Sequence, residues 1–407
     1  MTTDSIGSVI GPRGLLATPS YLRLWFAGGV GNAMRWLELL VAGIFTYDMT
    51  QSALMVALVT AARTLPMLLI GAFAGVIGEA LNRKFLLLLQ LSVASASSVA
   101  VCLLDFAGVA QVWHVALAGL VGGVVWATEL AVRRRMIGEV VAIGHVGAAV
   151  ALDSLTGSVA RMIGPFVGGV VYETLGLGGA YLLSAVLYLM AVRVVSRLEF
   201  HQETRKLRFG RIAGDIAEGA ATARANPAIL AVVLVSIINN MLGFCYSALI
   251  PPIGLAGYGV TPTLVGALAA AEPLGAIISG VALSAGWIRI DGARALLRGS
   301  FLFFLGLVAF ALAPWYALAF VILVVGGLGT AAFSIMQTTL VLTEAPPALR
   351  SRVMGLVTMC IGTGPLGVVA IGVLSEQLGA PIAIVTMAGA GLCGLTLVWA
   401  FLLRARR

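Results

Sequence analysis

Long apolar segments alternate with short polar gaps along the whole chain. Twelve of these segments lie near residues 24–47, 53–78, 85–106, 112–130, 147–171, 178–196, 228–252, 262–287, 297–314, 316–341, 353–374 and 381–403. Each approaches or exceeds the ~20 apolar residues that a helix needs to cross about 30 Å of hydrocarbon. Since no period-two alternation competes with them, the pattern predicts an all-helical integral membrane protein with twelve transmembrane helices.

The segments fall into two sets of six, separated by the one long charged stretch of the chain. The sequence therefore predicts an N-terminal six-helix half over 1–196, a cytoplasmic linker with a surface helix over 197–227 and a C-terminal six-helix half over 228–407. Gly164-Pro165 in the fifth segment recurs as Gly364-Pro365 in the eleventh. We interpret this recurrence as a sign of internal duplication.

Lysine and arginine are confined to every second gap. Of the 25 basic residues, three lie well inside the apolar segments, and the other 22 lie in these gaps or within about three residues of the segment ends that border them. Short loops with basic residues stay on the cytoplasmic side during insertion. We therefore expect a multi-pass protein of the bacterial cytoplasmic (inner) membrane with both termini cytoplasmic. The other gaps carry Asp48, Asp105, Glu173 and Glu376, and we expect them on the opposite side.

Composition excludes a soluble domain and argues against nucleic-acid binding. The chain is 60% hydrophobic and 10% charged, whereas soluble domains contain about 25% charged residues. The net charge of +8 is dispersed over short loops and forms no basic face of the kind that binds nucleic acid. Residues 1–20 lack the arrangement of a secretory signal, so we expect the first segment to be retained.

The chain carries no recognisable reaction centre. Its four cysteines lie apart inside apolar segments and its three histidines fall at separate segment ends, so neither a disulfide framework nor a metal site is predicted. No phosphate-binding glycine loop and no nucleophile with an adjacent base is apparent. We therefore expect a protein that is not an enzyme, needs no cofactor and draws its energy from an ion gradient.

The end of the second segment carries a pattern, over residues 75–84, that resembles the signature Gly-x-x-x-Asp-Arg-x-Gly-Arg-Lys of the major facilitator superfamily. Glu79 takes the place of the aspartate, whereas Ala80 and Asn82 replace the arginine and the glycine. The resemblance implies an inner-gate latch, rewired through 133–135 because Ala80 lacks a charge. Ordinary anchoring of the loop is the alternative. The residues of this proposed latch are Gly75, Glu79, Arg83 and Lys84.

Residues 151–169, in the fifth segment, resemble the antiporter signature of facilitator exporters. Gly164, Pro165, Gly168 and Gly169 are retained, and alanines stand at the first two glycine positions. Proline removes a backbone donor and small residues permit close helix contact, so we expect a kink and tight packing here. The resemblance implies export, although Gly-Pro could also simply bend a packed helix.

Further similarity extends over nearly the whole chain. Short motifs at 63–66, 161–165 and 345–354 look like those of the bacterial drug and siderophore exporter branch. The resemblance implies two six-helix halves that exchange a small molecule for protons within the lipid bilayer, and a protein that works as a monomer.

Six ionisable residues fall near the middle of the apolar segments. A charge in hydrocarbon costs about 2.5–3.5 kcal/mol on insertion scales, so these residues should face the bundle interior and pair or line an aqueous cavity. Asn32 extends the same helix face by one more polar position. A structural ion-pair network is the alternative to a role in coupling. The six are Arg35, Glu38, Arg63, Asp153, Arg161 and Glu272.

Glu38 and Glu272 are the best candidates for the carboxylate that binds and releases a proton, because burial and a nearby cation shift a carboxyl pKa in opposite directions. No intramembrane base lies in the C-terminal half to neutralise Glu272, so we expect its proton to be the more labile. Glu129 should form an intrahelical pair with Arg133, and Asp153 should bridge to the basic loop. We expect these last three to act at the gate.

Polar residues of the seventh and tenth segments could line a cavity for an amphipathic substrate. They are Asn239, Asn240 and Gln337, with Tyr246 and Trp36 as aromatic neighbours. Hydrogen bonds between helices explain the amides equally well.

These features together predict a major facilitator transporter that exports a small amphipathic molecule against inward proton flow. An importer or symporter would share the same composition, and whole-cell uptake against efflux would separate the two. A transporter-like scaffold or sensor is the third possibility, and it would tolerate neutralisation of Glu38 and Glu272.

Overall fold

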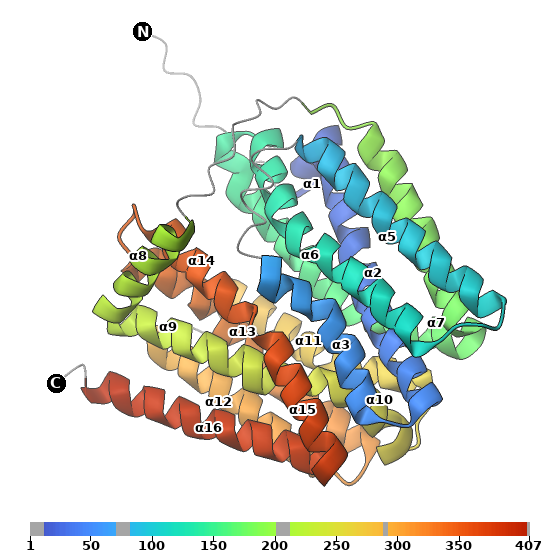
Figure 1. Cartoon of the computed structure of the whole chain (residues 1–407). Helices are drawn as coiled ribbons and strands as arrows, with labels where there is room; N and C mark the ends of the chain where they lie inside the picture. The colour runs from blue at the N-terminus through green and yellow to red at the C-terminus, as the bar shows by residue number, and fades with distance from the viewer. Residues whose placement is uncertain (1–11, 71–81, 201–211, 288–291, 405–407) are drawn as a thin grey trace.

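The computed structural model describes residues 12–70, 82–200, 212–287 and 292–404, and in these ranges it contains helices and no strand (Figure 1). In the first part of the chain the helices are α1 (Pro12–Leu16), α2 (Pro19–Thr50), α3 (Ala53–Ile70), α5 (Arg83–Phe106), α6 (Val112–Val140), η1 (Ile143–His145) and α7 (Val146–Ser196). The second part contains α8 (Ile212–Ala225), α9 (Pro227–Ile238), η3 (Asn239–Gly243), η4 (Phe244–Leu249), α10 (Ile250–Pro252), η5 (Ile253–Gly257), α11 (Pro262–Ser284), α12 (Gly292–Ala311), α13 (Tyr316–Glu344), α14 (Arg350–Ile361), α15 (Gly364–Leu378) and α16 (Ala380–Arg404).

The prediction of an all-helical fold with twelve membrane spans is confirmed. Ten helical stretches of the described chain are long and apolar enough to cross a membrane. One of them is α7, which runs for 51 residues and contains a break at Gly176, so it supplies two spans. The helix α2, whose middle carries Arg35 and Glu38, adds the twelfth.

The break in α7 occurs where the backbone needs a glycine. Gly176 has φ 70° and ψ −168°, a conformation that is open to glycine and costly for residues with a Cβ. The expected kink at Pro165 is not where α7 breaks, because the helix continues through that residue. The chain therefore reverses across the membrane after Gly176.

The buried apolar residues form two clusters, one within each set of helices. The first combines residues of α1, α2, α3, α5, α6 and α7, and the second combines residues of α8 to α16 with a few from α2 and α3. We call these sets the N-terminal and C-terminal halves. In Figure 1 the two halves converge near α10 and diverge toward α8 and the C-terminus.

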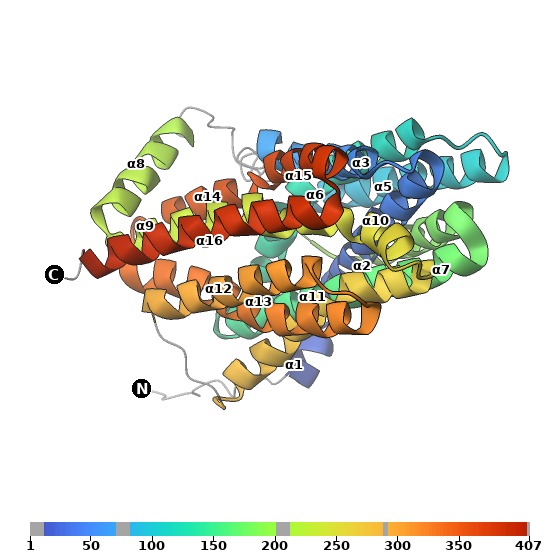
Figure 2. The ribbon, with the colours of Figure 1, turned by 90° about the horizontal axis from the view of Figure 1, so that it is seen from below.

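Two helix pairs make most of the contact between the described parts of the halves: α7 with α11 and α3 with α15. Figure 2 shows α3 and α15 side by side on one side of the bundle, and α11 and α13 on the other. Small residues permit the close approach in both pairs. A Cβ on Gly169 of α7 would overlap the Pro262 carbonyl oxygen of α11, and a Cβ on Gly372 of α15 would overlap Ala57 of α3.

The two ends of the bundle differ in charge. We call the end that carries Arg83 and residues 133–135 the basic end, and the end that carries Asp48, Glu173 and Glu376 the opposite end. At the opposite end the halves are tied by polar contacts, since Glu173 accepts a hydrogen bond from the Thr263 backbone N–H at 2.9 Å and Ser52 donates to Glu376 at 3.1 Å. The structure is therefore closed at the opposite end.

Substitution of Gly169 is expected to open this closed end. In Gly169→Ala the new methyl group collides with the Pro262 carbonyl, a backbone atom that cannot rotate away. Spin labels on Met49→Cys and Leu378→Cys, which are exposed residues of opposite halves, should report a longer distance across the end, in a Cys393→Ser background that removes the exposed native thiol.

Gly157→Ala is the control for this experiment. Gly157 lies in the same helix, and the nearest atom to a Cβ there is the Asn32 Nδ2 at 3.9 Å, an ordinary van der Waals contact. An unchanged label distance in Gly169→Ala, or an equal change in Gly157→Ala, would show that this contact does not hold the halves together.

The helix α8 lies between the two sets of membrane helices in sequence and packs against the start of α14. Glu218 of α8 forms an ion pair with Arg352, and a Cβ on Gly219 would approach the Arg352 carbonyl oxygen to 2.9 Å. In Figure 2 the helix α8 projects beyond the ends of α9 and α14. Residues 201–211 lie outside the described part of the chain.

Candidate functional site

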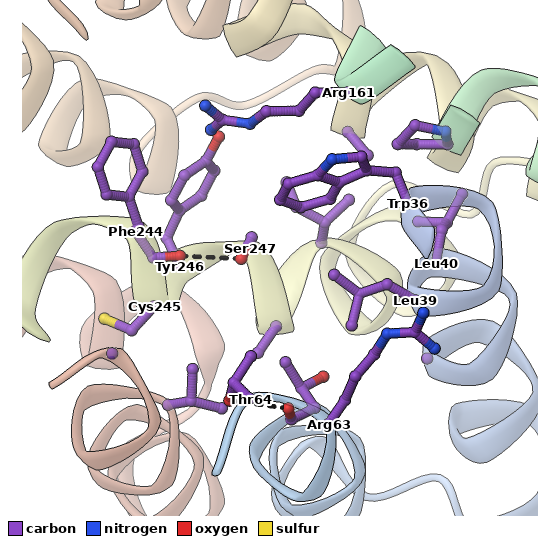
Figure 3. Close-up of a pocket in the computed structure, with 18 of the residues that line it drawn as sticks. Trp36, Leu39, Leu40, Arg63, Thr64, Arg161, Phe244, Cys245, Tyr246 and Ser247 are labelled. Atoms are coloured by element: carbon purple, nitrogen blue, oxygen red, sulfur yellow. Dashed lines mark hydrogen bonds between the residues drawn. The ribbon is translucent and has the colours of Figure 1, made fainter. Parts of the chain in front are cut away.

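A cavity of about 300 Å³ lies between the two halves. The middle of α2, α3 and α7 lines it from one half, and η3, η4, α11 and α15 line it from the other. Apolar and aromatic side chains make up most of its wall, among them Trp36, Trp126, Phe244 and Tyr246 (Figure 3). Such a mixture of aromatic wall and few polar groups is typical of small-molecule sites.

The floor of the cavity toward the opposite end is closed by close packing. Gly43 of α2 lies against Pro251 of α10, where a Cβ would come within 2.9 Å of the proline ring. The seventh span is irregular here, since η3 and η5 are π-helical turns and η4 is a 3-10 turn. Irregular turns of this kind are frequent at functional sites. Here η4 carries Phe244 and Tyr246, which line the cavity.

One ion pair crosses the cavity from half to half. Arg161 of α7 pairs with Glu272 of α11 through its Nη2 atom. No intramembrane base lies in the half that carries Glu272, and its partner in the structure comes from the other half. Sequence alone could not identify this partner, since the two residues are 111 positions apart. The greater lability expected of its proton stays a prediction.

The surroundings of this pair are asymmetric. Glu272 is buried and also accepts a hydrogen bond of 2.6 Å from the Thr330 hydroxyl of α13. The guanidinium of Arg161 lies between two aromatic rings, with its Cζ atom 5.5 Å from the Trp36 ring centroid and 5.3 Å from that of Phe244. Both distances fall in the range of cation–π contacts. Both residues line the cavity, and the arginine is the more exposed of the two.

A second pair lies on the wall formed by the N-terminal half. Arg63 of α3 contacts Glu38 of α2 at 3.1 Å, and Glu38 also accepts a hydrogen bond from the Ser98 hydroxyl at 2.9 Å. Both charged residues are buried. Glu38 is therefore satisfied by two partners, and its prediction as an intramembrane acid facing the bundle interior agrees with this position.

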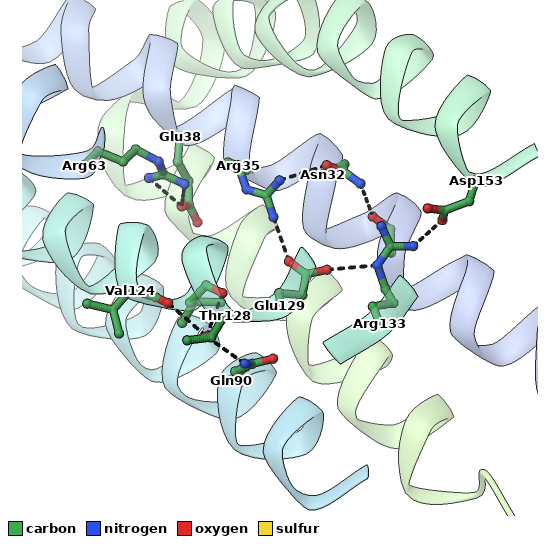
Figure 4. A network of polar contacts seen from close by, with 12 residues as sticks. Asn32, Arg35, Glu38, Arg63, Gln90, Val124, Thr128, Glu129, Arg133 and Asp153 are labelled. Atoms are coloured by element: carbon green, nitrogen blue, oxygen red, sulfur yellow. Dashed lines mark hydrogen bonds and ion pairs between the residues drawn. The ribbon is translucent and has the colours of Figure 1, made fainter. Parts of the chain in front are cut away.

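Glu129 joins two arginines rather than one. Its distance from Arg133, four residues on, is 3.3 Å, as the spacing predicts, but it also contacts Arg35 of α2 at 2.6 Å. Arg133 pairs in addition with Asp153 of α7. The expected simple intrahelical pair is thus part of a chain of charges across three helices, which Figure 4 shows from Asn32 to Asp153.

Glycines make room for this network. A Cβ on Gly28 would overlap the Arg133 guanidinium, and one on Gly31 would come within 3.3 Å of a Glu129 carboxylate oxygen. Asn32 donates to the Gly28 carbonyl and accepts from Arg35 at 2.8 Å. The polar residues expected on one face of the first span therefore meet different helices: Arg35 pairs with Glu129 of α6, whereas Glu38 contacts α3 and α5.

A small second cavity of about 20 Å³ lies within the N-terminal half, between the Glu38 and Glu129 pairs. Its lining includes Gln90 and Tyr181, each with a buried oxygen that has no hydrogen-bond partner among the described residues. A space of this size is sufficient for about one water molecule.

The predicted cavity amides separate into two groups. Asn240 lines the cavity. Asn239 instead donates to the Ser300 hydroxyl at 2.9 Å, and Gln337 donates to the Ser236 hydroxyl at 2.6 Å. These last two amides lie among helices of the C-terminal half, outside the described cavity lining, as the alternative of helix–helix hydrogen bonding predicts.

The predicted latch residues are only partly described. Gly75, Glu79 and Ala80 lie outside the described residues. Arg83 begins α5 and pairs with Glu139 near the end of α6, and Lys84 follows it.

The antiporter-like glycines permit close packing, since a Cβ on Gly164 would come within 2.6 Å of the Ala33 carbonyl oxygen of α2.

Gly168 packs against the same helix as Gly164. A Cβ on Gly168 would come within 3.1 Å of the Leu37 carbonyl oxygen of α2. Together with Gly169 at α11, these residues place α7 in contact with its own half and with the other. The prediction of tight packing at this motif therefore agrees with the structure, whereas its link to transport direction stays a prediction.

The family of the chain follows from comparison with known proteins. A family model for transmembrane secretion effectors matches residues 11–406. The chain belongs to this family of major facilitator transporters. The secretion effector family match thus extends over both halves and the cavity between them. No curated protein matches the chain significantly in sequence.

Solved structures of major facilitator transporters share the fold. A POT family transporter in complex with a thioalcohol conjugated peptide superposes with a TM-score of 0.75 at 10% identity, over 95% of this chain and 96% of that one. The nucleoside transporter NupG gives 0.70 at 14% identity, over 93% and 98%. A bacterial homologue of the human lysosomal transporter Spinster, inward-facing and unoccupied, gives 0.69 at 17%, over 94% and 95%.

Proposed function

We propose that this protein exports a small amphipathic molecule, of the drug or siderophore class, in exchange for protons. Its two halves would rock about the central cavity, which opens to one side of the membrane at a time. The basic end lies on the cytoplasmic side of the bacterial inner membrane, in accordance with the distribution of Lys and Arg. The structure then corresponds to a state closed toward the outside, and the monomer is the working unit.

The observation that carries this proposal is the Arg161–Glu272 pair in the cavity between the halves. While Glu272 is ionised, its attraction to Arg161 ties α7 to α11. A proton on Glu272 removes that charge and weakens the tie, so the closed arrangement loses part of its stability relative to the open one. A proton that Glu272 takes up from the outside in the open state would then be released to the cytoplasm when the halves close at the outer end and the pair with Arg161 forms again.

The antiporter-like packing at 164–169 supports export as the direction. These glycines hold α7 against α2 and α11 where the halves meet. Close packing there would prevent protons from leaking past the cavity while the halves move. Direction itself rests on the resemblance of this segment and of the whole chain to facilitator exporters.

Uptake into inside-out vesicles tests the proposal. A panel of labelled amphipathic drugs and siderophores is offered to vesicles that contain the protein, with and without an inside-acid pH gradient. We expect at least one compound to accumulate only when the gradient is present. A blank panel, with folded protein confirmed in the membrane, would contradict the export proposal.

An importer that carries substrate and proton together is the second candidate, and the same ion pair favours it if the substrate is negatively charged. An anion bound to Arg161 would compete with Glu272 for the guanidinium, and a proton on Glu272 would then remove the carboxylate charge that has lost its partner. Substrate and proton would then bind together, whereas an antiporter requires them to exclude each other. Loss of a preloaded compound from the same inside-acid vesicles would identify this mode.

A further inference from the structure

The ion pairs around the cavity share one orientation. In each pair the arginine lines the cavity, and the carboxylate lies behind it or buried beside it. We propose that the substrate of this cavity is an anionic amphiphile, with a flat apolar body and a carboxylate or a similar acidic group. The inference rests on the proposed transport function and names the substrate class of the same site. An anion on Arg161 is also the condition under which carriage of substrate and proton together is favoured, so the vesicle assay decides between that mode and exchange.

Most of the charged residues that line the cavity are basic. Its charged members among the described residues are Arg35, Arg63, Arg161 and Glu272. The partners of the first two, Glu129 and Glu38, are not part of the lining and face the interior of the N-terminal half. A molecule in the cavity therefore meets three guanidinium groups and one carboxylate, that of Glu272.

In the pair that crosses the cavity, the arginine is also the more exposed partner. The side chain of Arg161 is 31% exposed, whereas that of Glu272 is 1% exposed. A cationic substrate could reach Glu272 only by displacing Arg161, and it would also meet two further arginines on the opposite wall. An anion can bind Arg161 from the open side and leave Glu272 with its hydrogen bond to Thr330.

The aromatic residues specify the body of the ligand. Arg161 lies between Trp36 and Phe244, and Arg35 lies with its Cζ atom 5.0 Å from the Trp126 ring centroid. All three rings line the cavity. Aromatic faces accept flat apolar groups, and a guanidinium fork binds carboxylate oxygens in a bidentate manner. A cavity of about 300 Å³ lies at the small end of ligand pockets, so the body should be one or two fused rings.

Three probes of equal shape and different charge test this inference directly. The probes are 2-naphthoate, the neutral 2-naphthamide and the cation 2-naphthylmethylammonium, each measured by equilibrium dialysis against the purified full chain in nanodiscs. We expect naphthoate to bind about 10-fold more tightly than the amide, in line with the strength of a charged hydrogen bond, and the cation to bind most weakly. Equal binding of all three, or preference for the cation, would overturn the proposal.

Variants place the preference at Arg161. The double variant Arg161→Gln/Glu272→Gln removes both charges and leaves no buried carboxylate without a partner, so it should fold while losing the preference for naphthoate. Arg161→Lys should keep a reduced preference, because lysine retains the charge but not the planar fork. Arg298→Gln, at an exposed arginine of α12 outside the cavity, is the matched control and should bind as the unmodified chain does.

The outcome separates this inference from the transport proposal. Dialysis measures binding without any gradient, so a charge preference can hold even when vesicles accumulate nothing. A preference for naphthoate that persists unchanged in the folded double variant would contradict the assignment to Arg161. Folding of each variant is checked by size-exclusion chromatography before dialysis.

Discussion

Glu272→Gln is expected to abolish proton-driven transport while the protein remains folded in the membrane. The amide keeps the shape of the side chain and can still accept from Thr330, but it cannot take up a proton or pair ionically with Arg161. The gradient-dependent part of uptake should fall about 10-fold or more, the effect of a coupling free energy above about 1.4 kcal/mol. Uptake by inside-out vesicles at several lumenal pH values measures it.

A matched substitution at an uncoupled acid controls this experiment. Glu344→Gln changes an exposed carboxylate at the end of α13, which accepts a long hydrogen bond of 3.4 Å from the Asn226 amide. It should transport as the unmodified protein does, with the same dependence on pH. If Glu272→Gln also kept its pH dependence, Glu272 would have no part in coupling, and Glu38→Gln would be the next variant to measure.

Glu129→Gln is expected to lower stability more than any other single change in the N-terminal half. Glu129 is buried and neutralises both Arg35 and Arg133. Removal of its charge leaves Arg35 without an ionic partner in a buried position, and breaking a buried pair costs about 3–5 kcal/mol. The free energy of unfolding in mixed detergent micelles should fall by an amount in this range.

Glu139→Gln, ten residues further along α6, is the control for this prediction. Its carboxylate also pairs with an arginine, Arg83, but its side chain is 44% exposed. Exposed pairs contribute about 0–1 kcal/mol, so this variant should lose little. Equal losses in Glu129→Gln and Glu139→Gln would mean that burial does not set the strength of the network.

The sequence predicts the spans well because hydrocarbon imposes a simple length and polarity rule on each helix. The same rule identifies the mid-membrane charges, since a charge in an apolar segment is conspicuous. It does not identify their partners: Arg35 meets Glu129 across 94 positions and Arg161 meets Glu272 across 111. Such pairs depend on how helices pack, and packing depends on contacts that no local pattern records.

Local backbone detail was also beyond the sequence. The break of α7 occurs at Gly176 rather than at the conspicuous Pro165, because several glycines nearby could each have supplied it. In the seventh span, Pro251 and Pro252 are the only local sequence feature that indicates the π and 3-10 turns at 239–257. These turns place Phe244 beside Arg161, so the aromatic setting of the central pair could be seen only in the structure.

Proton movement during transport tests the central claim most directly. The purified protein is placed in proteoliposomes that contain a trapped pH-sensitive dye, and a compound found in the vesicle screen is added outside. The account predicts that protons leave the lumen as the compound enters, and that Glu272→Gln shows neither movement. Entry of the compound with no change in lumenal pH, or with protons moving in the same direction, would contradict exchange of substrate for protons.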